Sequence, residues 1–146
     1  MKIALATYPW AYFTPGGGEI QIEKLFEQFH LKGIDAQKFN QWEPQYNFDI
    51  YHYFSCMGGS FDFCNFLKNY KKKLIISSSL WITNDKKSNY PLDAIVNQLC
   101  LADFIVVNSF MEKKLLSDIT LINKDKFKVV HNGFDEKLLK FRKVSV

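Results

Sequence analysis

The segment KIALATYPWAYFTPGGGEIQIEKLFEQF, residues 2–29, joins two different hydrophobic patterns through a turn-rich loop. Residues 2–7 are a short apolar run without polar alternation, which is typical of a strand buried on both faces. Further along, apolar residues recur at i, i+3, i+4 and i+7, the spacing of one helix face: Ile22, Leu25, Phe26 and Phe29. Gly33 follows as the residue expected just beyond the helix end. The segment therefore predicts a buried strand, a loop and an amphipathic helix.

The same alternation continues to the end of the chain. Five more apolar segments are predicted strands, at residues 34–39, 48–54, 73–77, 104–107 and 127–130. Two further helices are predicted from apolar faces made by Phe63, Phe66, Leu67 and Tyr70, and by Leu92, Ile95, Val96 and Leu99. We therefore expect one α/β domain over residues 1–146, with a doubly wound, mainly parallel Rossmann-like sheet of about six strands and helices on both faces.

Polar residues mark two helix starts near the end of the chain. Ser109 and Glu112 have the spacing of a capping box, in which each side chain satisfies a free backbone donor, and the helix is expected to run to about Ser117. Asp135 is placed to cap a last short helix. In a doubly wound sheet ligands bind beyond the carboxyl ends of the strands. A ligand site is therefore expected among the loops that follow the strands, at residues 7–18, 55–60, 78–84, 108–109 and 131–135.

Composition narrows the class of protein. Of 146 residues, 47% are hydrophobic and 23% charged, which is typical of a folded globular chain and excludes a disordered one. The apolar runs are too short to span a bilayer. Three cysteines without paired spacing indicate a reducing cytoplasm, and Cys56 and Cys64 are expected to be small buried residues.

The net charge of +4 does not indicate nucleic-acid binding, because 18 of the 19 basic residues are lysines and base readout favours arginine. A weak peripheral attraction to an anionic membrane, through residues 71–73 and 137–143, stays open. The sequence holds none of the H-E-x-x-H, C-x-x-C or G-x-S-x-G motifs, so we expect no metal site and no cofactor.

Gly16, Gly17, Gly18 and Glu19 lie between the first strand and the first helix. Bare backbone N–H groups at a helix N-terminus suit a phosphate or a sugar hydroxyl. The dinucleotide fingerprint G-x-G-x-x-G does not fit, because Gln21 stands at its third glycine, and the Walker loop does not fit either. A tight turn without a ligand remains the alternative.

Four segments in order resemble the N-terminal half of a retaining, family-4-like (glycogen-synthase-type) glycosyltransferase with the GT-B fold. PGGGE at residues 15–19 is similar to its Gly-Gly-x-E loop, and FDIYH at 48–52 to its D-[IV]-[IV]-H strand. ADFIVVNS at 102–109 is similar to its A-D-x-[IV]-[IV]-x-x-S strand, and KVVHNGFD at 128–135 to its K-[IV]-x-V-[IP]-x-N-G-[VF]-D segment. Together they cover nearly the whole chain.

The resemblance implies an acceptor-side domain whose C-terminal donor domain is absent, and hence a chain that is inactive alone. The complete enzyme would move a sugar from a nucleotide-sugar to a glycan or glycolipid acceptor, without a cofactor. By family habit it would serve polysaccharide biosynthesis in the cytoplasm, peripherally at the inner face of the cell membrane.

The resemblance also assigns roles to residues. Gly16–Gly18 and Glu19 would approach the donor phosphate and the acceptor, Asn132, Gly133 and Asp135 would lie at the interdomain hinge, and Ser109 would cap a helix facing the cleft. Relatives often carry a second histidine where this chain has Phe54, so His52 is a weak catalytic candidate, and from the residues alone a hydrogen-bonded core histidine is favoured. Trp10 and Trp81 are acceptor-contact candidates, because aromatic faces stack on sugar rings.

Two other functions stay open. The chain fits a non-catalytic α/β binding module, or a partner subunit of a separately encoded catalytic half. It also fits an unrelated nucleotide-binding α/β domain, for which tight binding of a free nucleotide would be expected. Self-association through the open face of the domain is a further expectation.

Overall fold

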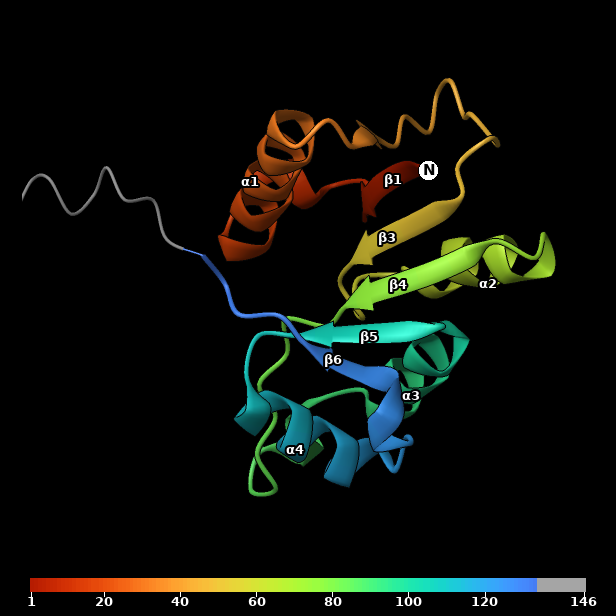
Figure 1. The fold of residues 1–146 in the computed structure, drawn as a ribbon. Helices are drawn as coiled ribbons and strands as arrows, with labels where there is room; N and C mark the ends of the chain where they lie inside the picture. The colour runs from red at the N-terminus through yellow and green to blue at the C-terminus, as the bar shows by residue number, and fades with distance from the viewer. Residues whose placement is uncertain (134–146) are drawn as a thin grey trace, which may run out of the picture.

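Six parallel strands form one sheet in the computed structural model, which describes residues 1–133 (Figure 1). They are β1 (Lys2–Thr7), β2 (Asp35–Lys38), β3 (Ile50–Phe54), β4 (Lys73–Ser77), β5 (Phe104–Val107) and β6 (Phe127–Val129). Their spatial order is β2-β1-β3-β4-β5-β6, and every adjacent pair is parallel. The direction of winding reverses between β1 and β3, so the switch point of the sheet lies there.

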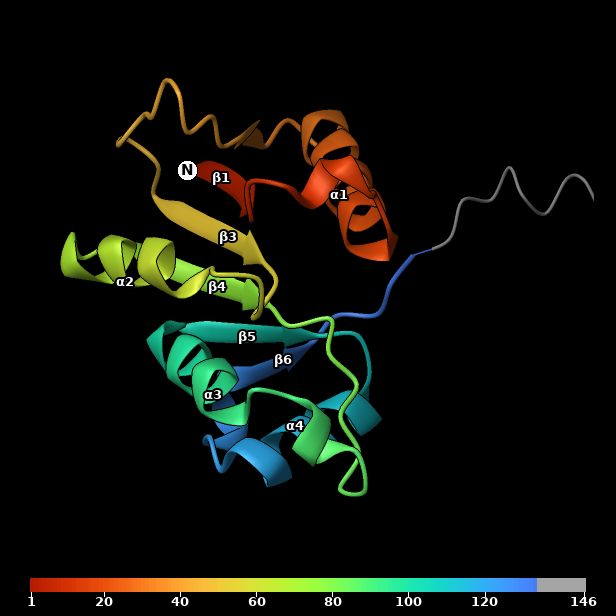
Figure 2. The same ribbon diagram turned by 180° about the vertical axis from the view of Figure 1, so that it is seen from behind.

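Within residues 1–133, four helices cover the two faces of this sheet. They are α1 (Gly17–Leu31), α2 (Phe61–Asn69), α3 (Leu92–Leu101) and α4 (Phe110–Thr120), with short 3₁₀ turns η1 (Ala11–Phe13), η2 (Lys87–Asn89) and η3 (Lys124–Lys126). α1 lies on one face, and α2 and α3 lie on the other, as the opposite views in Figures 1 and 2 show. The predicted doubly wound α/β fold is confirmed.

The core consists of two clusters separated by the sheet. The larger contains Ala4, Tyr51, Leu74 and Ile105 from the strands, together with buried residues of α2, α3 and α4. The smaller lies under α1 and contains Ile3, Leu5, Ile22, Ala36 and Phe54. β1 contributes to both clusters, which is the physical reason for its uninterrupted apolar sequence. Burying each large apolar side chain contributes about 1.5–3 kcal/mol.

The prediction for the apolar face of α2 is partly wrong. Cys64 and Leu67 are the residues this helix buries, whereas Phe66 is 39% exposed and Tyr70 is 63% exposed. α2 ends at Asn69, so Tyr70 lies beyond the helix, and the residues of α2 that pack in the larger core cluster as buried side chains are Cys64 and Leu67. The prediction that Cys56 and Cys64 are buried is confirmed, and burial raises the pKa of both thiols to about 12.

Helix ends follow their local chemistry. Gly33 has φ +68° directly after the C-cap Lys32, the left-handed conformation expected of a glycine beyond a helix end. α4 runs to Thr120, a turn beyond the predicted end near Ser117. The predicted last helix with Asp135, and the basic residues 137–143, lie outside the described residues. Within residues 1–133, no helix is long and apolar enough to cross a membrane.

Candidate functional site

A cavity of about 190 Å³ opens at the carboxyl ends of β1, β3 and β4, beside the switch point. It is lined by Tyr8, Gly18 and Glu19, by Phe54, Ser55, Cys56 and Met57, and by Ser78, Ser79 and Leu80. Eight of these ten residues come from three of the five loops that the sequence singled out, and Glu19 and Phe54 directly adjoin those loops. The cavity therefore lies at the carboxyl edge, where the sequence predicts a site, and its binding of a ligand stays a prediction.

The glycine segment forms the first turn of α1. We expected Gly16–Gly18 to form a loop before the helix, but α1 begins at Gly17, with Gly16 as its N-cap. Gly16 has no side chain that could cap the free N–H groups of this turn. Instead Glu19, which is buried, accepts a hydrogen bond from the backbone N–H of Gly16 at 2.7 Å. The turn thus carries exposed backbone donors at the positive end of the helix.

The fold itself does not require glycine at positions 17 and 18. Neither residue has a positive φ, and a Cβ built at either would meet nothing within 4 Å. Glycine in a helix is about 1 kcal/mol less favourable than alanine. The two glycines therefore leave room around their N–H groups at a cost in stability, and Gly18 lines the cavity.

Glu19 is also linked to the aromatic wall of the cavity. The hydroxyl of Tyr8 donates to Glu19 Oε1 at 3.4 Å, and burial, followed by the charge of Glu19, raises the pKa of Tyr8. The Tyr8 ring lies 5.6 Å from the ring of Trp10, and Trp10 packs beside Gly58 and Gly59. Trp10 is 53% exposed and so presents part of its indole to solvent near the cavity.

Trp81, the other aromatic candidate, is 55% exposed and directly follows the lining residue Leu80. Neither Trp10 nor Trp81 lines the cavity itself, and their contact with an acceptor stays a prediction.

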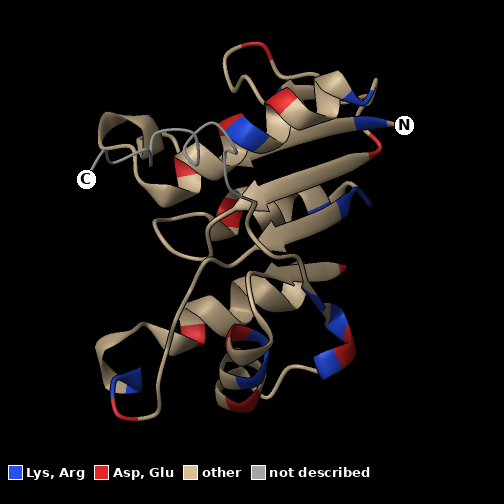
Figure 3. Cartoon of the chain, turned by 60° about the vertical axis from the view of Figure 1, so that its left-hand side comes forward, with Lys and Arg blue, Asp and Glu red and all other residues tan. Residues whose placement is uncertain are grey.

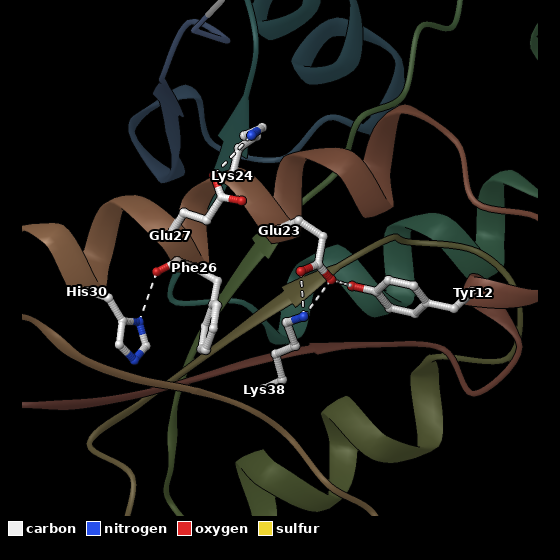
Figure 4. A network of polar contacts seen from close by, with 7 residues as sticks. All are labelled: Tyr12, Glu23, Lys24, Phe26, Glu27, His30 and Lys38. Carbon is white, nitrogen blue, oxygen red and sulfur yellow. Dashed lines mark hydrogen bonds and ion pairs between the residues drawn. The ribbon is translucent and has the colours of Figure 1, made fainter. Parts of the chain in front are cut away.

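A second network fixes the segment that leads into α1 (Figure 4). Tyr12 of η1 donates to Glu23 Oε1 at 2.7 Å, and Lys38 at the end of β2 donates to the same oxygen at 2.6 Å. Lys38, and then Tyr12, lower the pKa of Glu23 through these hydrogen bonds. The segment with Trp10 is thereby tied to both α1 and β2. The Lys24–Glu27 ion pair and His30 lie further along α1 (Figure 4).

Glu112 connects the loops after β4 and β5. Its Oε1 accepts from Ser78 Oγ at 2.9 Å and from the N–H of Leu80 at 3.0 Å, and its Oε2 accepts from the N–H of Asn108 at 2.7 Å. Ser109 Oγ accepts from the Glu112 N–H at 3.0 Å, so Ser109 caps α4 as predicted. The second half of the predicted capping box is wrong, because the buried carboxylate reaches the Asn108 N–H and the β4 loop instead of the Ser109 N–H.

Gln21 joins α1 to three other segments at the carboxyl edge. Its Nε2 donates to Asn132 Oδ1 at 2.8 Å and to Asn108 Oδ1 at 3.3 Å, and Ser79 Oγ donates to its Oε1 at 3.4 Å. Asn132, a predicted hinge residue, therefore lies against the helix that lines the cavity. Gly133 follows it with open space around it, and Asp135 lies outside the described residues. Sequence reasoning missed Gln21, because its partners are up to 111 positions away.

His52 lies in β3 beneath α1 and does not line the cavity. Its ring stacks on Phe54 at 4.3 Å, and its Nε2 lies 2.8 Å from Ser77 Oγ. Burial lowers the pKa of His52 to about 4, so the ring is neutral at physiological pH. This arrangement is that of a hydrogen-bonded histidine within the fold, the alternative favoured from the residues alone.

Four segments at the carboxyl edge lack charged residues. Residues 55–60, 78–84, 108–111 and 130–133 contain no Lys, Arg, Asp or Glu, the residue types that are blue or red in Figure 3. Among residues 1–133, Glu19 is the one charged residue that lines the cavity. The same residues hold no group of three or more His, Cys, Asp or Glu side chains that could bind a metal ion. The described lining thus offers hydroxyls, backbone groups and one carboxylate.

Solved structures of HepE from Anabaena share this fold. The chain matches HepE in complex with UDP with a TM-score of 0.65 and 17% identity, over 94% of this chain and 46% of HepE. Over the same shares, it matches HepE with UDP and glucose at a TM-score of 0.64 and 17% identity, and HepE with UDP-glucose at 0.64 and 15%. At these identities the likeness establishes the fold alone.

The chain therefore spans about half the length of the solved structures it matches. No protein-family model matches the chain, and no curated protein matches its sequence. The fold and the cavity together define a Rossmann-like α/β domain with a small opening at its switch point.

Proposed function

We propose that this chain forms the acceptor-side half of a nucleotide-sugar-dependent glycosyltransferase with the GT-B architecture, of the retaining, family-4-like kind. The observation that carries the proposal is the first turn of α1: two glycines that the fold does not require, beside a cavity at the switch point. The likeness in fold to HepE, which was solved with UDP and with UDP-glucose, supports the same assignment.

In this proposal the first turn of α1 stabilises the leaving group. A diphosphate bound next to Gly17 and Gly18 receives hydrogen bonds from their backbone N–H groups and the favourable field of the helix N-terminus. The interaction strengthens as negative charge develops on the departing phosphate, which lowers the barrier to transfer. The absence of Lys and Arg from the described cavity lining leaves backbone donors as the main contribution of this half.

The acceptor in this proposal is a neutral, hydroxyl-rich sugar unit. Ser55 and Ser79 supply hydroxyl groups, and Glu19 is the single charged group of the described lining. Trp10 and Trp81 would stack on the sugar rings at the rim. We further propose that the acceptor belongs to a polysaccharide or glycolipid assembled at the cytoplasmic face of the membrane, and that the chain alone is inactive.

The proposal is tested by NMR on the ¹⁵N-labelled chain titrated with UDP-glucose, UDP and glucose. We expect saturable shifts of the Gly17 and Gly18 amide signals with UDP-glucose, at a Kd of about 1 mM, because one half of the site contributes only about 4 kcal/mol. The Gly33 amide at the opposite end of α1 is the internal control and should not shift.

Three outcomes separate the alternatives. First-turn amides that stay unchanged at about 10 mM UDP-glucose, ten times the expected Kd, contradict the proposal. Binding of free UDP at about 1 μM would favour an unrelated nucleotide-binding domain. Turnover of radiolabelled UDP-glucose by the purified chain would overturn the inactivity of this half.

A further inference from the structure

Two residues that line the cavity have positive φ angles, a backbone conformation that residues other than glycine rarely adopt. Ser55 has φ +122° and Ser79 has φ +45°, and neither is a glycine. Such conformations persist only where surrounding contacts over-determine them, and they concentrate at functional sites. The contacts that hold these two serines are therefore informative about how the cavity keeps its shape.

Ser55 is held on three sides. Its N–H donates to the carbonyl of Ser77 at 3.1 Å, and its Oγ accepts from the N–H of Met57 at 3.0 Å. Its carbonyl accepts from Nε2 of Gln98 at 3.0 Å. The first contact joins the ends of β3 and β4, and the second is local to the loop, whereas the third comes from α3, 43 positions away in the sequence.

Gln98 is an unusual residue for its place in α3. It is 2% exposed, and its neighbours Ile95 and Leu99 on the same helix face are fully buried apolar residues. A buried amide without partners is costly, whereas an apolar side chain of similar volume is easily accommodated there. Its Nε2 contacts Cys64 Sγ at 3.7 Å as well, a weak bond compared with the one to Ser55. The hydrogen bond to the carbonyl of Ser55 therefore best explains why an amide is buried at this position.

The loop after β4 repeats the arrangement. Glu112, 4% exposed, accepts hydrogen bonds from Ser78 and Leu80, the residues on either side of Ser79. Each strained serine therefore lies in a loop fixed by one buried polar side chain from a helix behind it.

We propose that Gln98 is a positioning residue, which holds Ser55 in its left-handed conformation and thereby fixes the wall formed by residues 55–57 opposite the first turn of α1. The consequence for ligand binding rests on the proposed function. The consequence for the backbone of Ser55 does not.

The test is a double-mutant cycle of Gln98→Met and Ser55→Gly. Methionine keeps the volume of Gln98 but removes the donor, and glycine adopts φ +122° without strain. In the chain that keeps Ser55, Gln98→Met should speed hydrogen exchange of the Ser55 and Met57 amides about tenfold and weaken UDP-glucose binding by a similar factor, equivalent to about 1.4 kcal/mol. In the chain that carries Ser55→Gly, both effects should fall below about threefold, because less strain remains to be held.

Asn97→Met, on the exposed side of α3, is the matched control and should change neither quantity. If Gln98→Met changed hydrogen exchange and affinity equally with and without Ser55→Gly, Gln98 would be an ordinary core contact. If Gln98→Met left the exchange of the Ser55 and Met57 amides unchanged, Gln98 would have no role in positioning Ser55. If Gln98→Met does not fold, the double variant Gln98→Met, Ser55→Gly decides: it should fold, because glycine adopts φ +122° without a partner to hold it, and a double variant that also fails to fold overturns the inference. Failure of the wild-type chain to bind UDP-glucose would count against the proposed function only, since the exchange data still judge the positioning role.

Discussion

Replacing Gly18 with alanine should change stability and ligand binding in opposite directions. Gly18 is the second residue of α1, has no positive φ, and leaves open space where a Cβ would stand. Alanine is therefore tolerated by the folded state and restricts the unfolded chain, which stabilises the domain by about 0.5–1 kcal/mol. For a domain of this size, that corresponds to a rise in Tm of roughly 1–4 °C.

The same methyl group would stand between the first-turn N–H groups and a phosphate. Because Gly18 lines the cavity, we expect at least a roughly tenfold loss of UDP-glucose affinity, about 1.4 kcal/mol. Stability is measured by thermal and urea denaturation, and binding by NMR titration. The variant would refute the reasoning if it bound UDP-glucose as tightly as the wild type, or if it lost stability.

Gly33→Ala provides the matched control on the same helix. Gly33 has φ +68° beyond the C-terminus of α1, so alanine should destabilise the domain by about 1 kcal/mol and leave binding unchanged. Comparing the two variants distinguishes Gly33, which the backbone conformation requires, from Gly18, which it does not require.

Three further changes test other parts of the structure. His52→Gln should flatten the loss of stability on acidification: burial lowers the folded-state pKa of His52 from 6.5 to about 4, so the wild type loses on the order of 3 kcal/mol as the pH falls through that window, the unfolded chain taking up the proton first. Urea denaturation across this range checks it, and parallel curves for both proteins would contradict it. Glu112→Gln should destabilise the domain by roughly 2 kcal/mol, because an amide cannot accept all the hydrogen bonds that the carboxylate accepts from Ser78, Leu80 and Asn108; a change in unfolding free energy below about 0.5 kcal/mol would show that these bonds contribute little. In the proposed two-domain enzyme, Trp10→Ala should weaken acceptor binding several-fold, as measured by the KM for acceptor, at an aromatic contribution of about 0.5–1.5 kcal/mol; an unchanged KM removes Trp10 from the site.

The strands could be predicted from sequence because helices cover both faces of the sheet, so the buried strands are continuous apolar runs. β1 is buried on both faces, so its pattern needs no partner to be recognised, and its bounds match the prediction. The face of α2 could not be predicted as well, since two aromatic residues near its end, Phe66 and Tyr70, stay partly exposed. Aromatic side chains satisfied the helical period without being buried.

The edge of the sheet at which the cavity lies was predictable, but the contacts that shape the cavity were not. The rule that ligands bind at the carboxyl ends of parallel strands pointed to the loops that line the cavity. The roles of Gln98 and Gln21 could not be predicted, because their hydrogen-bond partners lie far away in the sequence. A usable signal existed for Gln98, which interrupts the apolar face between Ile95 and Leu99 with a residue that must find a buried partner.

A crystal structure of the protein with UDP-glucose tests the central proposal most directly. We expect phosphate oxygens at about 2.7–3.2 Å from the backbone nitrogens of Gly17 and Gly18, with the sugar directed toward the cavity lined by Ser55 and Ser79. A ligand bound elsewhere, with the first turn of α1 left in contact with solvent, would contradict it.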